Sequence, residues 1–262
     1  MSDRKPWVVV LGASSGFGAA TARAFAQRGH PIFGVHLDRR GGMPAVEALV
    51  AELRGYGVDV VFHNGNAADE DERKRAIDRL AEAAGDVPVG VLLHSLAFGT
   101  LRPFFPDDGS AGLQERQLAM TLDVMANSLV YWAQDLVGRG LLRDGAHIYA
   151  MTSAGSLVAW PSYGAVSAAK CALESHIRQL AVELAPRGIT ANAILAGVTR
   201  TAALEKIPGA AALAEKALAR NPTGRLTTPE DVAACLVALA VPGTRWLTGN
   251  VLRVDGGETI AG

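Results

Sequence analysis

The stretch "WVVVLGASSGFGAATARAFAQRG", Trp7–Gly29, decides the fold. A short apolar run opens it and predicts a buried strand, and Gly12, Gly16 and Gly18 follow at once. A helical segment, Ala19–Gly29, comes next. Glycines between a strand and a helix let the backbone approach a pyrophosphate, which then lies at the positive end of the helix. We therefore predict a dinucleotide site at this turn, although an ordinary strand–helix turn can also be rich in glycine.

The rest of the chain repeats this alternation of apolar runs and helical periods. Further strands are predicted at 31–37, 58–64, 89–97, 146–153, 189–197 and 249–257, and further helices at 43–57, 69–85, 116–140, 167–188 and 227–240. The strands are continuous apolar runs, as parallel strands covered on both faces should be. We predict an α/β fold: a single Rossmann-type doubly wound parallel sheet of about seven strands flanked by helices, with residues 1–262 as one domain.

The composition argues against several classes of function. The 25 basic residues nearly balance the 26 acidic ones, which disfavours a nucleic-acid-binding protein. Two separate cysteines and six scattered histidines predict neither a disulfide framework nor a metal site. The N-terminal apolar run is too short for a signal peptide, and no apolar stretch approaches the ~20 residues of a membrane span. The sequence therefore predicts a cytoplasmic protein that does not enter the membrane.

The spacing of the three glycines, GxxxGxG, resembles the short-chain dehydrogenase/reductase family. Four more motifs extend the resemblance along nearly the whole chain: "NAA" at 66–68, "HSLA" at 94–97, "AGVTRT" at 196–201 and "VDGG" at 254–257. Ala196 replaces the proline that the family usually has at that place. The resemblance implies the following contacts with a nicotinamide cofactor: Gly12, Ser14, Ser15, Gly16, Phe17, Gly18, Arg39, Arg40, Asn66, Ala67, Ser95, Leu96, Ala97, Lys170, Gly197, Val198 and Thr201.

The end of the second predicted strand bears on the choice between NADPH and NADH. An acid there usually binds the ribose diol, whereas an arginine nearby accommodates the 2′-phosphate of NADPH. Counted from Gly12, the position of the NAD-selecting acid falls on His36, so Asp38 lies beyond it. Arg39 and Arg40 can turn toward a phosphate as charge-assisted donors. We predict NADPH, with NADH as the alternative and a solvated loop as the other explanation of the two arginines.

The catalytic candidates are Tyr163, Lys170 and Ser153. In most members of the family the tyrosine lies four residues before the lysine and the serine seventeen before it. Counting back from Lys170 gives Ser153, but the tyrosine position holds Val166, and Tyr163 lies three residues further upstream. If helical, Tyr163, Val166 and Lys170 share one face, with the phenol displaced by roughly 4.5 Å along the axis. The position of the family's usual asparagine on the long helix falls on Met125, with Asn127 in an alternative register.

The displaced tyrosine predicts which bond is reduced. A ketone receives hydride on its carbonyl carbon, whereas an enoyl thioester receives it on the β-carbon and develops charge on an oxygen two carbons away. With "LLHSLAFG" and "AGVTRTAAL", the six-residue gap between Tyr163 and Lys170 resembles the enoyl-acyl-carrier-protein reductase branch. That resemblance implies Tyr163 as donor to the thioester oxygen and Lys170 as the residue that holds the nicotinamide ribose. The alternatives are a carbonyl or 3-oxoacyl reductase that uses Ser153, and a non-catalytic NADP-binding sensor.

The substrate side is predicted from apolar residues near these motifs. Residues 200–226 are small, apolar and broken by prolines, which suits a lid over an acyl chain; a surface helical pair is the alternative. Phe98, Trp160 and Ala202 are the predicted pocket residues, and His94 is predicted to be packed rather than catalytic. We predict an acyl thioester substrate, with an acyl carrier protein as the candidate carrier. The family resemblance also implies a homotetramer.

Overall fold

The fold is a parallel sheet of seven strands, seen in a computed structural model that describes residues 4–261. The strands are β1 (Trp7–Leu11), β2 (Ile32–His36), β3 (Val60–Asn64), β4 (Val89–His94), β5 (Leu142–Thr152), β6 (Thr190–Ala196) and β7 (Val251–Val254). Their order in the sheet is β3-β2-β1-β4-β5-β6-β7, and every neighbouring pair is parallel. The chain order reverses beside β1, and such a switch point is where doubly wound folds bind ligands.

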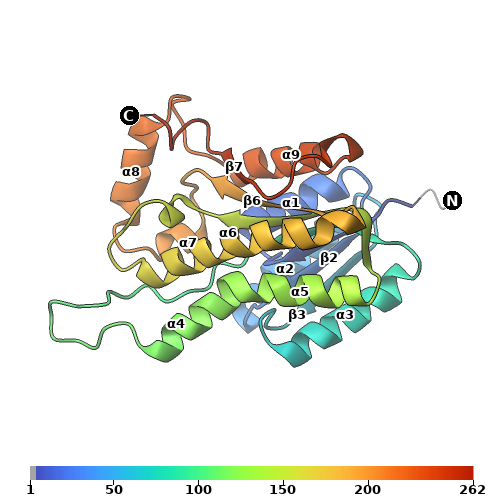
Figure 1. The fold of residues 1–262 in the computed structure, drawn as a ribbon, viewed down its shortest axis with the longest axis horizontal. Coiled ribbons are helices and arrows are strands. Elements are labelled where there is room, and N and C mark those ends of the chain that lie inside the picture. The colour runs from blue at the N-terminus through green and yellow to red at the C-terminus, as the bar shows by residue number, and fades with distance from the viewer. Residues whose placement is uncertain (1–3, 262) are drawn as a thin grey trace.

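Two helical layers cover the sheet, as Figure 1 shows. The helices are α1 (Gly16–Ala26), α2 (Met43–Arg54), α3 (Glu70–Ala84), α4 (Glu115–Leu122), α5 (Ser128–Gly138), α6 (Gly164–Leu184), α7 (Ala202–Glu205), α8 (Ala210–Arg220) and α9 (Pro229–Leu239). Alternate residues of β1 point to opposite layers. Trp7, Val9 and Leu11 pack with α3, α5 and α6, whereas Val8 and Val10 pack with α1, α2 and α9. The predicted doubly wound architecture is therefore confirmed.

Side-chain caps fix several helix starts that the sequence predicts. Asp69 precedes α3 and accepts a hydrogen bond from the Glu72 N–H at 2.9 Å. Thr228 and Asp231 form a reciprocal capping box at the start of α9, where Pro229 is the first helical residue. Such caps satisfy N–H groups that have no partner inside the helix. They also hold the negative side chains at the positive end of each helix dipole.

Two predicted helices differ from the structure in ways that matter for the site. The long helix predicted at 116–140 is interrupted by a π-helical turn, Asp123–Asn127, between α4 and α5. Helix α6 begins at Gly164, and Tyr163 is its N-cap with φ −96° and ψ 1°. A helical face shared with Val166 and Lys170 was predicted only for a helical Tyr163, and this condition is not met, because the helix has not yet begun at Tyr163.

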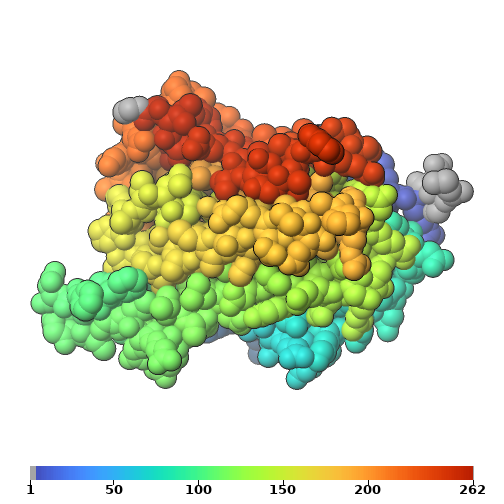
Figure 2. All heavy atoms as spheres, in the orientation of Figure 1, coloured from blue at the N-terminus to red at the C-terminus, as the bar shows by residue number. Residues whose placement is uncertain are grey.

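Two segments lie on the side of the sheet where the catalytic candidates are found. Residues 200–226 fold into the short helices α7 and α8, so the segment predicted as a lid is helical. The connection between β4 and α4, residues 95–114, projects from the body of the molecule together with α4 (Figure 2). Among residues 4–261, none of the helices has the length and apolar character needed to cross a membrane.

Candidate active site

In the glycine loop, the backbone comes very close to another backbone segment at two glycines, Gly12 and Gly18. Gly12 has φ 88°, and a Cβ atom placed on it would lie 2.5 Å from the carbonyl oxygen of Ser95 at the end of β4. A Cβ on Gly18 would lie 2.0 Å from the carbonyl oxygen of Gly12. Both distances are far below contact, so only glycine fits at these two positions. The loop that holds Ser14, Ser15 and Phe17 is thereby folded tightly between β1 and α1.

The residues around this loop fit a dinucleotide. The first turn of α1 contains no acidic residue, so its free N–H groups and positive dipole face the loop unopposed. A Cβ atom on Gly16 would meet only the methyl group of Thr201, at 3.6 Å, which leaves the surface of the loop open. The Ser95 N–H donates to the carbonyl of Leu11, which places the predicted 95–97 segment beside the same loop.

The Gly18 contact gives a first prediction. We expect Gly18→Ala to weaken NADPH binding by at least tenfold, since a lost charge-assisted bond costs about this much and the methyl group must push the Gly12 carbonyl out of place. Titration of nicotinamide fluorescence measures the Kd. Gly138→Ala is the matched control, because an added Cβ there meets no atom within 4 Å. Equal Kd values for the two variants would contradict the prediction.

Asp38 is bound by its own neighbours at the end of β2. Its carboxylate lies 2.9 Å from Nδ1 of His36, and its backbone exchanges two hydrogen bonds with the Asn64 side chain, at 3.2 and 3.0 Å. Arg39 and Arg40 follow, and both are exposed. Asn66 caps the next turn by accepting from the Ala68 N–H at 3.1 Å. The two arginines are therefore the free cations of this edge, whereas Asp38 is engaged.

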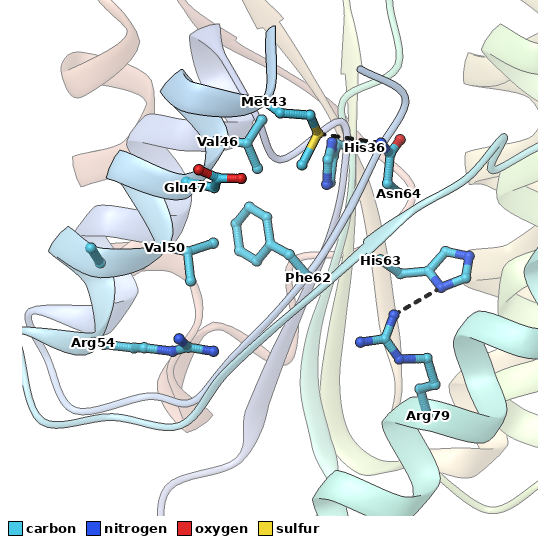
Figure 3. A pocket seen from close by; sticks show the side chains of 11 residues that line it. His36, Met43, Val46, Glu47, Val50, Arg54, Phe62, His63, Asn64 and Arg79 are labelled. Carbon is cyan, nitrogen blue, oxygen red and sulfur yellow. Dashed lines mark hydrogen bonds between the residues drawn. The ribbon is translucent and has the colours of Figure 1, made fainter. Parts of the chain in front are cut away.

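A pocket of about 520 Å³ lies beside the free edge of the sheet, between α2 and α3. Figure 3 shows Phe62 of β3 directed toward α2, and the next residue, His63, directed to the opposite side near Arg79. The pocket is lined by His36, Met43, Val46, Glu47, Val50, Ala51, Arg54, Phe62, His63, Asn64 and Arg79. None of the predicted catalytic residues belongs to this lining, so the chemistry has to be sought at the ends of β4, β5 and β6.

Tyr163 reaches the end of β5 through an irregular turn. Ser162 precedes it in a left-handed conformation with φ 63°, a strained geometry that is uncommon for a residue other than glycine. The phenol oxygen lies 3.5 Å from Oγ of Ser153. A Cβ atom on Gly155 would lie 2.3 Å from the Tyr163 ring, so the small residue at 155 makes room for the tyrosine. Burial raises the pKa of Tyr163, partly offset by the bond to Ser153, which keeps the phenol protonated.

Lys170 is buried one and a half turns into α6. Its Nζ donates to the carbonyl oxygen of Met151 at 2.6 Å, and 5% of the residue is exposed. Burial lowers its pKa to about 8, against an opposing effect of the negative charge of Glu174. Glu174 itself accepts a hydrogen bond from Oγ1 of Thr152 at 2.6 Å. Met151 and Thr152 are the last residues of β5, and Ser153 follows them directly. Lys170 is therefore held at the end of the strand that also positions Ser153.

The position four residues before Lys170 lies in an apolar cluster. Val166 and Met125 are both buried and pack together with Ala169. A Cβ atom on Gly99 would lie 2.8 Å from Val166 and 2.9 Å from the Met125 sulfur, so the space is filled. Asn127, the alternative for the missing asparagine, instead pairs with Nε2 of His176 at 3.0 Å, further along α6. Position 166, where most family members have their proton donor, therefore holds none, and Tyr163 packs against the same cluster from outside α6.

His94 is a packed histidine. It is fully buried at the end of β4, and its Nε2 lies 2.9 Å from Oγ of Ser128. Because the Ser128 hydroxyl donates to the Val124 carbonyl, Nε2 must carry the proton and donate to Ser128. Burial, with a smaller effect of the positive charge of Lys170, lowers the His94 pKa to about 3. His94 is therefore neutral at physiological pH and is unsuited to acid catalysis.

The residues predicted to line a substrate pocket lie in three different segments. Nε1 of Trp160 donates to the carbonyl oxygen of Pro208 at 3.2 Å, which connects the turn before Tyr163 to the segment 200–226. Ala202 is the first residue of α7, and Phe98 is 60% exposed. Phe104 was not predicted. Its ring lies 2.5 Å from the position of a Cβ atom on Gly164, over the start of α6.

The segment 197–201 completes the site after β6. A Cβ atom on Gly197 would lie 2.3 Å from Oγ1 of Thr227, so this glycine is packed tightly. The Val198 N–H donates to the carboxylate of Glu258 at 2.9 Å. Thr201 caps α7 by accepting from the Leu204 N–H at 3.2 Å. Among the described residues there is no cluster of three or more side chains suited to a metal ion.

A glycine loop at a switch point, with a half-buried tyrosine and a buried lysine nearby, defines the class of nicotinamide-dependent oxidoreductases. A family model described as "Enoyl-(Acyl carrier protein) reductase" matches residues 12–259. The chain belongs to the short-chain dehydrogenase/reductase family. It is an oxidoreductase that depends on NAD or NADP.

The names of individual relatives imply different reactions: some reduce a C=C bond, and others act on a carbonyl or hydroxyl group. The NADH-dependent enoyl-acyl-carrier-protein reductase of Aquifex aeolicus is 32% identical over 84% of this chain and 79% of its own. Its crystal structure superposes with a TM-score of 0.85 at 26% identity, over 99% and 98% of the two chains. The galactitol 2-dehydrogenase of Cereibacter sphaeroides is 30% identical over 96% of this chain and 94% of its own. A 3-oxoacyl-acyl-carrier-protein reductase of Brucella melitensis, solved with NAD, has a TM-score of 0.85, 26% identity and 100% coverage of both chains.

Proposed function

We propose that the protein reduces the C=C bond of a 2-enoyl thioester with NADPH. The observation that carries the proposal is the place of Tyr163, which stands outside α6 while Val166 fills the usual donor position with buried hydrocarbon. A donor placed away from Lys170 suits an oxygen two carbons away from the carbon that is reduced. The Aquifex aeolicus relative, by its name an enoyl reductase, supports the same assignment.

Each polar residue has a defined part in this reaction. The cofactor, when bound, supplies the hydride for the β-carbon of the substrate, and a proton from solvent then adds to the α-carbon as the enolate returns to the thioester. Tyr163 donates a hydrogen bond to the thioester oxygen, and its raised pKa keeps the donor proton in place while negative charge develops on that oxygen. Lys170 binds the nicotinamide ribose through its ammonium group. Ser153 lies within reach of the Tyr163 hydroxyl and orients it.

Apolar residues near the start of α6 suit an acyl chain. Trp160 and Phe104 lie at the start of α6 next to Tyr163, and Phe98 is an exposed aromatic residue of the connection 95–114. We infer that the segment 200–226 closes over the chain as a lid, with Trp160 attached to it through Pro208. The thioester is carried by an acyl carrier protein or by coenzyme A, since both present the same acyl group to Tyr163.

A pair of parallel assays tests the reaction. The protein is mixed with NADPH and crotonyl thioester, and separately with NADPH and acetoacetyl thioester, and absorbance at the reduced nicotinamide band is followed. We expect oxidation of NADPH with the enoyl substrate. Oxidation with the ketone alone would overturn the proposal and establish the second candidate, a 3-oxoacyl or carbonyl reductase. That candidate is favoured by the 3.5 Å contact between Ser153 and Tyr163, a pair that a ketoreductase would use.

The cofactor preference gives a second prediction. We expect the double substitution Arg39→Ala and Arg40→Ala to raise the Kd for NADPH about tenfold and to leave the Kd for NADH unchanged, since a hydrogen bond to a charged group is worth ~1.5–3 kcal/mol. Titration with each reduced cofactor measures both values. Arg178→Ala, which removes an exposed arginine of α6, is the control. A preference for NADH in the unsubstituted protein would refute the assignment.

A further inference from the structure

The C-terminal turn, residues 255–259, lies against the segment that follows β6. Oε2 of Glu258 accepts a hydrogen bond from the Val198 N–H at 2.9 Å. The same oxygen would lie 2.9 Å from a Cβ atom on Gly197. Two segments about sixty residues apart in the sequence are therefore joined through one side chain. Figure 1 shows the last described part of the chain, coloured red, leading from β7 toward α8.

The turn that presents Glu258 is fixed by its own hydrogen bonds. The carboxylate of Asp255 accepts from the Gly257 and Thr259 N–H groups, each at 3.0 Å, and the Glu258 N–H donates to the Asp255 carbonyl at 3.1 Å. Glu258 is 7% exposed, and burial raises its pKa. A buried carboxylate needs a donor, and the Val198 N–H supplies one. The side chain is thus held in one place by the turn behind it and the backbone in front.

The far end of the segment 200–226 is tied to the same turn. Nδ2 of Asn221 donates to the Asp255 carbonyl at 3.0 Å, and Arg220 donates to the Ala261 carbonyl at 3.1 Å. Thr227 contacts Gly197 on the same side as Glu258, since both lie near the position of a Cβ atom on that glycine. The C-terminal turn therefore contacts the chain on both flanks of α7 and α8: Gly197 and Val198 before α7, and Asn221 after α8.

We propose that Glu258 is a positioning residue for the nicotinamide end of the cofactor. By holding the Val198 N–H, it fixes the peptide groups of Gly197 and Val198 in the orientation that the bound nicotinamide meets. The inference rests on the proposed function in one respect, the assignment of the segment 197–201 to the nicotinamide. Among the hydrogen bonds of residues 4–261, Glu258 is the only charged side chain of the C-terminal turn that accepts from the segment 197–201.

Two variants of similar size separate the hydrogen bond from the volume that Glu258 fills. Glu258→Met fills the space and cannot accept the bond, whereas Glu258→Gln retains an accepting oxygen. For each variant, the Kd for NADPH is measured by nicotinamide fluorescence. The Kd for adenosine 2′,5′-bisphosphate, which lacks the nicotinamide, is measured by calorimetry. We expect Glu258→Met to raise the Kd for NADPH about tenfold, leaving the fragment unchanged, and Glu258→Gln to stay within about twofold.

Several outcomes would overturn the inference. An unchanged Kd for NADPH in Glu258→Met would show that the bond positions nothing. An equal loss of NADPH and fragment binding would show a general structural role. If Glu258→Met does not fold, Glu258→Ala gives the same ratio of the two Kd values. Because both readouts are binding constants, NADPH binding without reduction of any enoyl thioester would refute the proposed function and leave this inference standing.

Discussion

Substitution of Tyr163 by phenylalanine is expected to lower kcat for an enoyl thioester by roughly 100- to 1,000-fold, the usual cost of losing one donor to a developing oxyanion. The Kd for NADPH should stay unchanged, because the phenol contacts the substrate side and the ring remains to fill the space beside Gly155. Stopped-flow absorbance under single-turnover conditions measures the chemical step, and fluorescence titration measures the Kd. An unaffected turnover rate would refute the role assigned to Tyr163.

Two further variants make the Tyr163 result specific. Tyr56→Phe removes the hydroxyl of a tyrosine beyond α2, 40% exposed, and should leave turnover unchanged. Val166→Tyr in the Tyr163→Phe background returns a phenol to the usual family position. It should not restore activity, because Val166 is packed against Gly99 and Met125 and the larger ring has no room. Full rescue by this double variant would show that the displaced position of Tyr163 is not required.

Substitution of Lys170 by methionine is expected to impair both binding and chemistry. The methionine fills the buried site but cannot donate to the Met151 carbonyl or to a ribose, so the Kd for NADPH should rise about tenfold. The ammonium charge that favours the enolate oxygen is lost as well, which should lower kcat by roughly 100-fold. The same titration and single-turnover assays separate the two effects. A normal Kd with reduced kcat would confine Lys170 to the chemical step.

The pKa of Lys170 gives this prediction a pH dependence. Burial lowers that pKa to about 8, so the lysine is charged below this pH and becomes neutral above it. The kcat/KM should therefore fall as the pH rises through about 8. The negative charge of Glu174 raises the Lys170 pKa, so Glu174→Gln should move this descending limb to lower pH. If the descending limb of the pH profile moved to higher pH or did not move in Glu174→Gln, the assignment of this limb to Lys170 would be contradicted.

Much of the fold could be predicted because each element carries its own local signal. The predicted helices 69–85 and 227–240 start within one residue of Asp69 and Thr228, which the structure shows to be the caps of α3 and α9. The strands were predicted within a few residues, except that β5 begins at Leu142, four residues before the predicted start. The π-helical turn at Asp123–Asn127 was missed, since it depends on how α4 and α5 meet α6 and not on local propensity.

The candidate site was predicted less completely, because several of its residues act through others. Glu174 and Glu258 carry no motif of their own. One accepts from Thr152 and the other from Val198, contacts that exist only after distant strands have been placed side by side. Phe104 reaches the start of α6 from a projecting loop, which the sequence gives no reason to expect. Spacing along the sequence cannot predict acidic residues that lie close to a motif only in the folded structure.

Periodicity, glycine spacing and the six-residue gap between Tyr163 and Lys170 are properties of the chain, and by themselves they determined the doubly wound sheet and the family, whereas the dinucleotide site at the glycine loop stays a prediction. The direction of Tyr163 was decided by tertiary structure. A left-handed Ser162 ends the turn, α6 starts one residue after the tyrosine, and the room beside Gly155 admits the ring toward Ser153. Spacing fixes how far apart two residues can be along a helix, whereas only packing decides where that helix begins.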